Sequence, residues 1–352
     1  RQSVPRNPLL GAIASCILIL ALGHFVFDEL LVADSVRDGY PYLMVALVLL
    51  APRLPAGRVA ESWLYGVLNF HLIWVGIALI VPSIPTRLPQ LQPGLGILTP
   101  RGDFDSAVCG VAAAIYLSAF LRGRKALYLV VVALNLIAAA LLLSRAGFVA
   151  AVVVVFAVLL SRVPASVHHG RRVVVVTLFA ASALALILAS PSIPILQRFA
   201  GSLGLPASNS ISLQAAGTEN ARISAWPTLY EYVAVENAQV LGLGFGRNIM
   251  EESGASVALN VQDDVRSPHN WWLDVYARLG IVGLLLITFL SAIGFVRGWR
   301  LLHGDSIQVA AGAVLIALPI VASLGVIFES PFGAVPYFFC LGASRWWYGR
   351  RE

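Results

Sequence analysis

The sequence predicts an all-α integral membrane protein, a polytopic helical bundle of about ten membrane spans with one large outer loop. Hydrophobic residues make up 59% of the 352 positions and charged residues only 12%, a composition that excludes an ordinary soluble globule. Several apolar runs are long enough to cross a hydrocarbon core of roughly 30 Å as helices. Lys and Arg gather in alternate short loops beside the ends of these runs, as the positive-inside rule requires.

The expected spans are separated by short connections and by a single long insertion. They are residues 9–27, 41–51, 63–82, 106–121, 126–143, 146–161, 173–190, 272–296, 307–328 and 332–348. The second run is too short to cross alone, so we expect it to borrow Leu30–Val36 or to be tilted or broken. The first is too long for a signal-peptide core and has no convincing cleavage site, so we expect it to be retained. Because the chain opens with Arg1, a further span upstream is left open.

The basic clusters predict the orientation of the chain. Arg122–Lys125, the Arg171–Arg172 pair and most of the other basic residues among the 24 fall in the predicted inner loops. Both termini are then inside. Residues 1–190 hold spans one to seven, 191–270 form the outer loop, and 271–352 hold the last three spans. The net charge of +6 therefore reflects topology and does not indicate nucleic-acid binding.

Other local patterns complete this organisation. The three cysteines lie in or beside different spans, so they predict neither a disulfide framework nor a metal site: Cys16, Cys109 and Cys340. In the outer loop, residues 219–236 have the apolar stripe of a helix lying on the membrane. Pro227 either interrupts this helix or occupies the first turn of a shorter one. We expect loop at 201–217, a turn at 237–246 and an acidic loop at 251–265.

His269 is the strongest candidate for chemistry in the outer loop. Ser267 suits an N-cap and Pro268 the first helical position, which would place His269 in the first turn of a span. The positive end of a helix disfavours imidazolium, so we expect a neutral histidine that can accept a proton. His269 is the only histidine in the predicted outer loops. A purely capping or interfacial role is the alternative.

Three arginines on the predicted outer side could bind an anion. Arg145 lies in a tight connection between two apolar runs, where a charge is costly unless it snorkels or meets an anion. Arg222 and Arg247 lie within the outer loop. A guanidinium group can bind two phosphate oxygens at once, so two or three of these side chains could hold a diphosphate without metal.

Glycine and aspartate residues form three further patterns on the predicted outer side. Gly242-Leu-Gly-Phe-Gly246 superficially matches a nucleotide fingerprint, but no βαβ unit surrounds it, so it predicts a turn that permits close backbone approach. Asp103-Phe-Asp105 has the spacing of a metal-binding pair, although a capping or solvated pair is the better interpretation. Asp263-Asp264 lies near enough in sequence to orient His269 or an acceptor, and is otherwise solvated loop.

In their order along the chain these motifs resemble the O-antigen ligase and polymerase family. The resemblance covers about residues 100–296 and rests on Ser144-Arg-x-Gly147, Arg222-x-x-x-Trp226, the glycine turn, His269-Asn270 and Gly280-x-x-Gly283. It implies a GT-C-like helical bundle in the bacterial inner membrane, with its active site facing the periplasm. Such proteins move glycans in lipopolysaccharide and cell-envelope polysaccharide biosynthesis.

The resemblance implies a metal-independent, inverting glycosyltransferase without a cofactor, whose donor glycan is carried on undecaprenyl diphosphate. His269 would deprotonate or orient the acceptor hydroxyl, and Arg145 and Arg222 would hold the diphosphate. We expect five further residues to contact substrate: Arg247, Trp226, Asn270, Gly244 and Gly246. The acceptor, a glycan or a lipid, would distinguish polymerase from ligase. A transporter or flippase of lipid-linked saccharides, and a membrane scaffold, are the alternatives.

Overall fold

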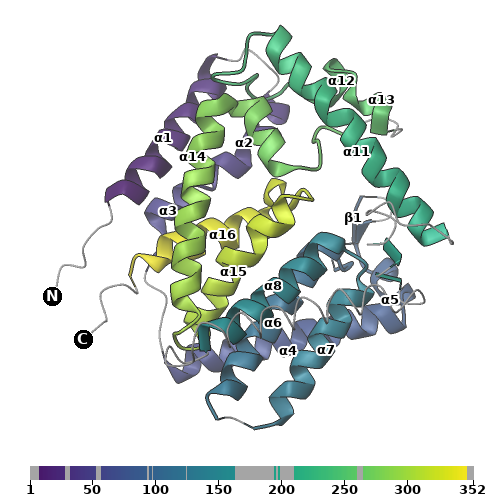
Figure 1. The fold of residues 1–352 in the computed structure, drawn as a ribbon, viewed down its shortest axis with the longest axis vertical. Coiled ribbons are helices and arrows are strands. Elements are labelled where there is room, and N and C mark those ends of the chain that lie inside the picture. The colour runs from purple at the N-terminus through teal and green to yellow at the C-terminus, as the bar shows by residue number, and fades with distance from the viewer. Residues whose placement is uncertain are drawn as a thin grey trace, which may run out of the picture. The chain divides into compact units, whose positions relative to one another are not determined.

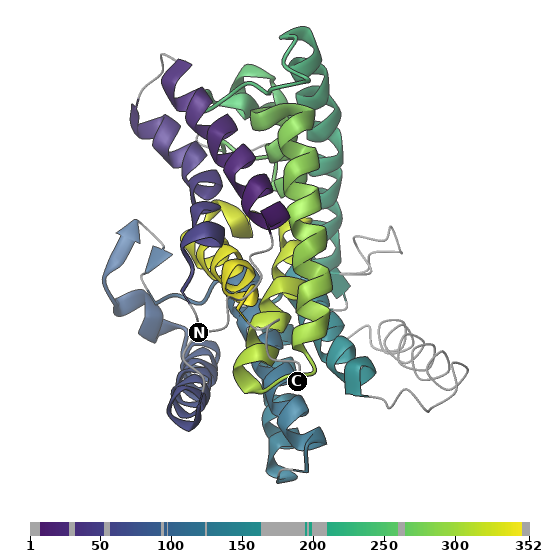
Figure 2. The same ribbon diagram turned by 90° about the vertical axis from the view of Figure 1, so that its left-hand side faces the viewer.

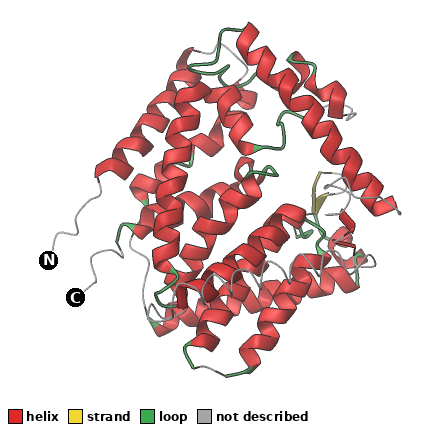
Figure 3. Cartoon of the chain, viewed as in Figure 1, coloured by secondary structure: helices red, strands yellow, loops and turns green. Residues whose placement is uncertain are grey.

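The computed structural model describes residues 8–27, 32–52, 57–92, 95–96, 98–123, 125–162, 194–195, 197–198, 210–259 and 265–346. Within these ranges the chain is helical apart from one short antiparallel hairpin, which pairs β1 (Gln90–Gln92) with β2 (Leu95–Gly96) (Figure 3). The predicted all-α fold class is therefore confirmed for the described part of the chain.

Figure 1 shows the helices of the described part of the chain. Their bounds are α1 Pro8–Phe27, α2 Val32–Leu43, α3 Ala46–Leu50, α4 Arg58–Ile80, α5 Ser83–Arg87, α6 Gly102–Leu121, α7 Leu127–Leu141, α8 Arg145–Arg162, α11 Ser210–Val235, α12 Ile249–Glu252, α13 Ala255–Leu259, α14 Trp271–Leu301, α15 Ser306–Ala322, the 3-10 helix η1 Ile327–Glu329 and α16 Pro331–Ser344.

Five of the described helices are long and apolar enough to cross a membrane, namely α1, α4, α6, α8 and α14. The apolar helices α7 and α15 are shorter. The expected second span is broken into α2 and α3, one of the alternatives that its length left open. The expected span at 173–190 lies outside the described residues. These helices indicate a multi-pass membrane protein, while the total of ten spans stays a prediction.

The chain divides into two compact units that cut across the order of the sequence. The first unit contains Arg1–Pro55, Thr218–Gly298 and Val314–Glu352, and the second contains Ala56–Gly217 and Trp299–Ala313. In the second unit, α6 packs closely against α7 and α8 (Figure 1). A Cβ placed on Gly110 of α6 would lie 2.5 Å from the Cα of Ala151 in α8, so only a residue without a side chain allows this approach.

Aromatic side chains that contact one another in series form a core in the first unit. Tyr42 of α2 stacks on Phe245 of the glycine turn (ring centroids 5.4 Å apart) and on Trp271 at the start of α14 (5.0 Å). Trp271 meets Phe328 of η1 edge-on, and Phe328 packs on Tyr337 of α16. Helices α1, α2 and α3 lie together in this unit (Figure 2). Residues distant in sequence thus meet in this core: Tyr42, Phe245, Trp271, Phe328 and Tyr337.

Helix α14 is broken at Gly280, whose backbone has φ 65° and ψ −167°. The break frees the carbonyls of Ala277 and Arg278 and the amides of Ile281 and Val282, and residues 239–244 pair with all four. Leu243 N and Gly244 N donate to the two carbonyls (2.8 and 3.0 Å). Ile281 N and Val282 N donate to Gln239 O and Val240 O (2.8 and 3.3 Å). Residues 239–244, which include the first part of the glycine turn, therefore replace the hydrogen bonds that a continuous helix would make.

Parts of the predicted outer loop are more helical than expected. The predicted surface helix at 219–236 is α11, which begins at Ser210, so the expectation of loop up to residue 217 is wrong for 210–217. Pro227 lies inside this helix and does not open a shorter one. The expected acidic loop contains α12 and α13. Residues 201–209 lie outside the described part.

Replacing Gly242 by alanine should destabilise the fold far more than the same change at Gly254. Both glycines have left-handed backbones (φ 87° and 75°), but a Cβ on Gly242 would lie 2.2 Å from the carbonyl of Arg278, whereas nothing lies within 4 Å at Gly254. We expect a loss of about 1–2 kcal/mol for Gly254→Ala from backbone strain alone. For Gly242→Ala we expect at least about 3 kcal/mol, because backbone must move. Thermal unfolding of both variants in detergent measures the difference; equal losses would contradict the docking of the turn on α14.

Candidate active site

The helix that carries the histidine motif begins later than the sequence predicts. Helix α14 starts at Trp271, and Asn270 is its N-cap, because its side-chain Oδ1 accepts from the amides of Trp272 (3.0 Å) and Leu273 (3.2 Å). The prediction that Ser267 caps the helix and that Pro268 opens it is therefore wrong. A helix that started at Pro268 would need the Ser267 hydroxyl and the Pro268 carbonyl, but Glu329 and Trp226 bind these two groups.

His269 consequently lies just before the N-cap and not in the first helical turn. Its backbone is left-handed (φ 54°), and its amide donates to Ser267 Oγ at 3.3 Å. Histidine is among the residues that adopt this conformation more often than others, although at a cost in free energy. Neighbouring contacts must hold the segment in place. We call residues 265–270 the histidine segment.

Helix α11 supplies one of these contacts. The indole nitrogen of Trp226 donates to Pro268 O at 2.9 Å. Arg222 lies one turn earlier on the same face of α11, and its Nη1 donates to Leu324 O (3.2 Å) in the connection between α15 and η1. The structure thus places the motif Arg222-x-x-x-Trp226 beside the histidine segment, as a shared site requires.

Glu329, at the end of η1, is a site residue that the sequence analysis missed. Ser267 Oγ donates to its Oε1, which ties η1 to the histidine segment. Burial, followed by the nearby Asp274 carboxylate, raises the pKa of Glu329 to about 8. A lone acidic residue between two apolar runs is the signal that could have revealed it.

The raised pKa predicts that stability falls as the pH rises. Unfolding returns Glu329 to its ordinary pKa of 4.5, so the folded state holds an extra proton between that value and about 8. The resulting stabilisation is complete below pH 4.5 and is lost progressively as the pH rises through about 8. Glu329→Gln should flatten the dependence of the unfolding temperature on pH in detergent, whereas the exposed control Glu231→Gln should not. An unchanged slope in Glu329→Gln would contradict the assignment.

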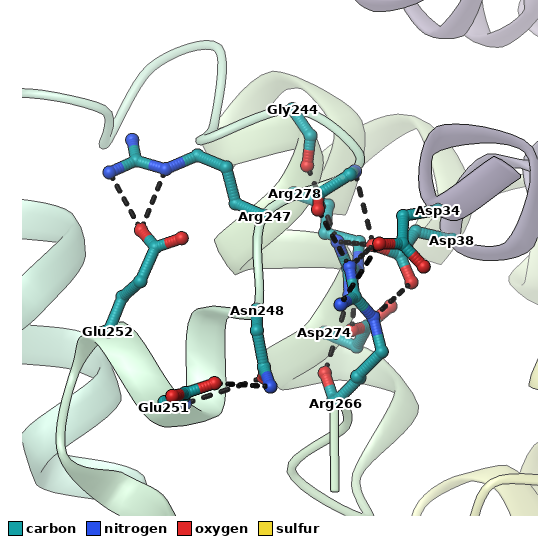
Figure 4. Close-up of polar contacts among 11 residues, drawn as sticks. Asp34, Asp38, Gly244, Arg247, Asn248, Glu251, Glu252, Arg266, Asp274 and Arg278 are labelled. Carbon is teal, nitrogen blue, oxygen red and sulfur yellow. Dashed lines mark hydrogen bonds and ion pairs between the residues drawn. The ribbon is translucent and has the colours of Figure 1, made fainter. Parts of the chain in front are cut away.

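Beneath the histidine segment lies a buried network of two carboxylates and two guanidinium groups (Figure 4). Asp38 of α2 accepts from Arg266 Nε and Nη2 (3.2 and 2.7 Å) and from Arg278 Nη1 (3.0 Å). Arg278 Nε donates to Asp274 Oδ1 (3.0 Å), and Tyr42 OH donates to Asp274 Oδ2 (2.7 Å). The charges are matched in pairs, which makes their burial tolerable.

Three of the expected substrate contacts engage the protein itself. Arg247 donates to Glu252 (2.8 Å), Glu236 (3.2 Å) and the hydroxyl of Tyr232 (2.7 Å). Gly244 N donates to Arg278 O, as described above. The carbonyl of Gly246 accepts from Arg266 Nη2 at 2.8 Å. The contact of these residues with substrate stays a prediction.

Arg145 belongs to the second unit, where it is the first residue of α8. Ser144 precedes it as a cap, since its Oγ accepts from Gly147 N at 3.1 Å and donates to Asp103 Oδ1. A cation at this end of a helix is unfavourable, which suits a role in anion binding.

The Asp-x-Asp pair is also engaged by protein groups. Asp105 accepts from Arg101 N and lies 2.8 Å from His71 Nε2, in addition to the contact between Asp103 and Ser144. Within the described ranges, no three His, Cys, Asp or Glu side chains are grouped so that they could hold a metal ion. Asp263 and Asp264 lie outside those ranges.

A match to a known protein family covers several of the residues described above. The family model described as O-Antigen ligase matches residues 128–288, a range that includes Arg145, Arg222, the glycine turn and His269. A comparison with curated proteins found no match. Over residues 128–288 the chain is therefore similar to the O-antigen ligase family, which confirms the resemblance predicted from its ordered motifs.

Proposed function

We propose that this protein transfers a glycan from undecaprenyl diphosphate to an acceptor hydroxyl at the periplasmic face of the bacterial inner membrane. The observation that carries this proposal is the hydrogen bond from Trp226 to the carbonyl of Pro268, the residue before His269, since Arg222 lies one turn from Trp226 on the same face of α11. A basic group for a proton and a guanidinium for phosphate oxygens are the two parts that glycosyl transfer from a diphosphate needs. The O-antigen ligase match indicates glycan transfer in O-antigen assembly and supports the same chemistry.

In this mechanism His269 accepts the proton of the acceptor hydroxyl as its oxygen attacks the anomeric carbon. The bond from that carbon to the diphosphate oxygen breaks, and undecaprenyl diphosphate leaves with the electron pair. Attack from the face opposite the leaving group inverts the anomeric configuration. Asn270 caps α14 next to the histidine and, with Trp226, supports the site.

The negative charge that develops on the leaving group needs compensation. Arg222 has its guanidinium oriented by Leu324 O, and the cation Arg145 begins α8. We assign Arg222 to the diphosphate, which guanidinium groups can neutralise without a divalent metal, and the same role for Arg145 stays a prediction. Arg247 is less suited to this task, because Glu236 and Glu252 already compensate its charge.

Reconstitution into proteoliposomes tests the proposal against transport of the same lipid. The vesicles contain a lipid-linked oligosaccharide with a labelled glycan, and acceptors of both kinds, a core lipid and a second lipid-linked glycan, are supplied. We expect label to move covalently to one acceptor, which also distinguishes ligase from polymerase. Movement of intact donor between leaflets without any covalent product would instead support a flippase.

A further inference from the structure

The buried network extends the site to a helix outside the O-antigen ligase match. Asp38 of α2 precedes residues 128–288 by a long stretch of chain. The residue is only 8% exposed, and its carboxylate contacts the histidine segment, α14 and the glycine turn. It accepts from Arg266 in the histidine segment and from Arg278 in α14 (Figure 4). It also accepts from the amide of Gly246 at 3.1 Å. The sequence predicts α2 only as part of the second membrane span.

We propose that Asp38 is a positioning residue for His269, one that fixes the histidine segment against α14 and the glycine turn. The inference rests on the proposed function, in which His269 accepts the acceptor proton.

The contacts of Asp38 connect it to the backbone next to His269. Arg266 lies three residues before His269, and its guanidinium forms a two-point contact with Asp38. The backbone carbonyl of Arg266 accepts from Arg278 Nη2 (3.3 Å), and Arg278 is itself bound to Asp38. One carboxylate thus holds both the side chain and, through Arg278, the backbone of Arg266. Trp226 holds Pro268 on the same side, and Asn270 caps α14 on the other side, so the left-handed backbone of His269 is held from both ends.

Charge explains why a carboxylate is needed at this position. The network contains the guanidinium groups of Arg266 and Arg278, which are 11% and 3% exposed as side chains, and the carboxylates of Asp38 and Asp274. Asp34 lies farther away, 3.8 Å from Arg266. An amide in place of Asp38 leaves one guanidinium without its carboxylate, and a reorganised Arg266 would displace the histidine segment.

The test compares Asp38→Asn and Asp38→Glu with wild type in the reconstituted transfer assay. We expect kcat to fall about 10- to 100-fold, because small displacements of a catalytic group have effects of this size. The donor KM should stay within about threefold, since Asp38 is not assigned to donor binding. Asp305→Asn is the matched control. Its carboxylate accepts from Gln308 N (2.9 Å) at the start of α15, and its loss should leave transfer unchanged.

A double-mutant cycle separates positioning from general weakening of the fold. In a His269→Ala background, Asp38→Asn should cause no further loss, because the group that it positions is absent. Multiplication of the two losses, or an unchanged kcat in Asp38→Asn, would overturn the inference. If Asp38→Asn does not fold, Asp38→Glu decides, because it keeps the charge and changes the reach. Failure of both to fold would assign Asp38 to folding alone.

The proposed function and this inference fail in different ways. Wild-type transfer by His269→Ala would refute the base assignment. A slow His269→Ala variant whose loss multiplies with that of Asp38→Asn would refute only the positioning role.

Discussion

Replacing His269 by alanine should lower glycan transfer by about 10²–10⁴-fold, the range for loss of a general acid–base group, while donor binding stays close to wild type. The acceptor hydroxyl then has no group to take its proton as it attacks. The purified variant in proteoliposomes gives the rate, and titration with lipid diphosphate gives the donor affinity. His269 lies in the histidine segment before the first turn of α14 and not within a helix, so the variant should fold.

His303→Ala is the matched control for this prediction. His303 lies between α14 and α15, where its ring Nδ1 is 3.3 Å from Arg300 O, and its removal should leave transfer unchanged. Wild-type transfer by His269→Ala would contradict the base assignment. Loss of activity through misfolding, seen as aggregation in size-exclusion chromatography, would favour a purely structural role for the histidine.

Arg222→Ala should weaken donor binding and also slow the departure of the diphosphate, lowering transfer by about 10²–10³-fold. The guanidinium offers paired donors in a plane, oriented by the contact of Nη1 with Leu324 O. Arg222→Lys should therefore restore little of the lost rate, because an ammonium group provides the charge but not the fork. Steady-state transfer over a range of donor concentrations separates the effects on KM and kcat.

The exposed Arg300, near the end of α14, provides a control for loss of a positive charge, and Arg300→Ala should bind donor as wild type does. If Arg222→Lys transfers glycan at the wild-type rate, a bidentate contact with the diphosphate is excluded. If Arg222→Ala changes neither KM nor kcat, Arg222 is a structural residue of α11.

Local spacing predicted the residues that lie within one turn of a helix or within one short segment. Arg222 and Trp226 lie on one face of α11 because residues four apart in a helix share a face. The apolar runs located the long helices α1, α4, α6, α8 and α14 for the same reason, since length and composition are local properties. The order of the motifs identified the family over residues 128–288.

The start of α14 could not be predicted locally, because distant residues decide it. A helix that begins at Pro268 needs the Pro268 carbonyl to accept from Trp272 N. The indole of Trp226 takes that carbonyl, and Asn270 Oδ1 accepts from Trp272 N instead. Ser267, the expected cap, donates to Glu329.

The acidic residues of the site could not be predicted from local sequence either. Glu329 is separated from the histidine motif by two helices, α14 and α15, and Asp38 lies far upstream in α2. Neither belongs to a short motif. Their roles depend on how α2, α14 and η1 pack around the aromatic core, which includes Tyr42.

The central claim is that glycan transfer releases undecaprenyl diphosphate without help from a divalent metal. The most direct measurement is the amount of free undecaprenyl diphosphate formed with each transferred glycan, by purified protein in excess chelator. We predict equal amounts of the two products, an inverted anomeric configuration in the glycan and no stimulation by Mg²⁺ or Mn²⁺. Glycan movement without free lipid diphosphate, or transfer that stops in chelator and returns with metal, would contradict the account.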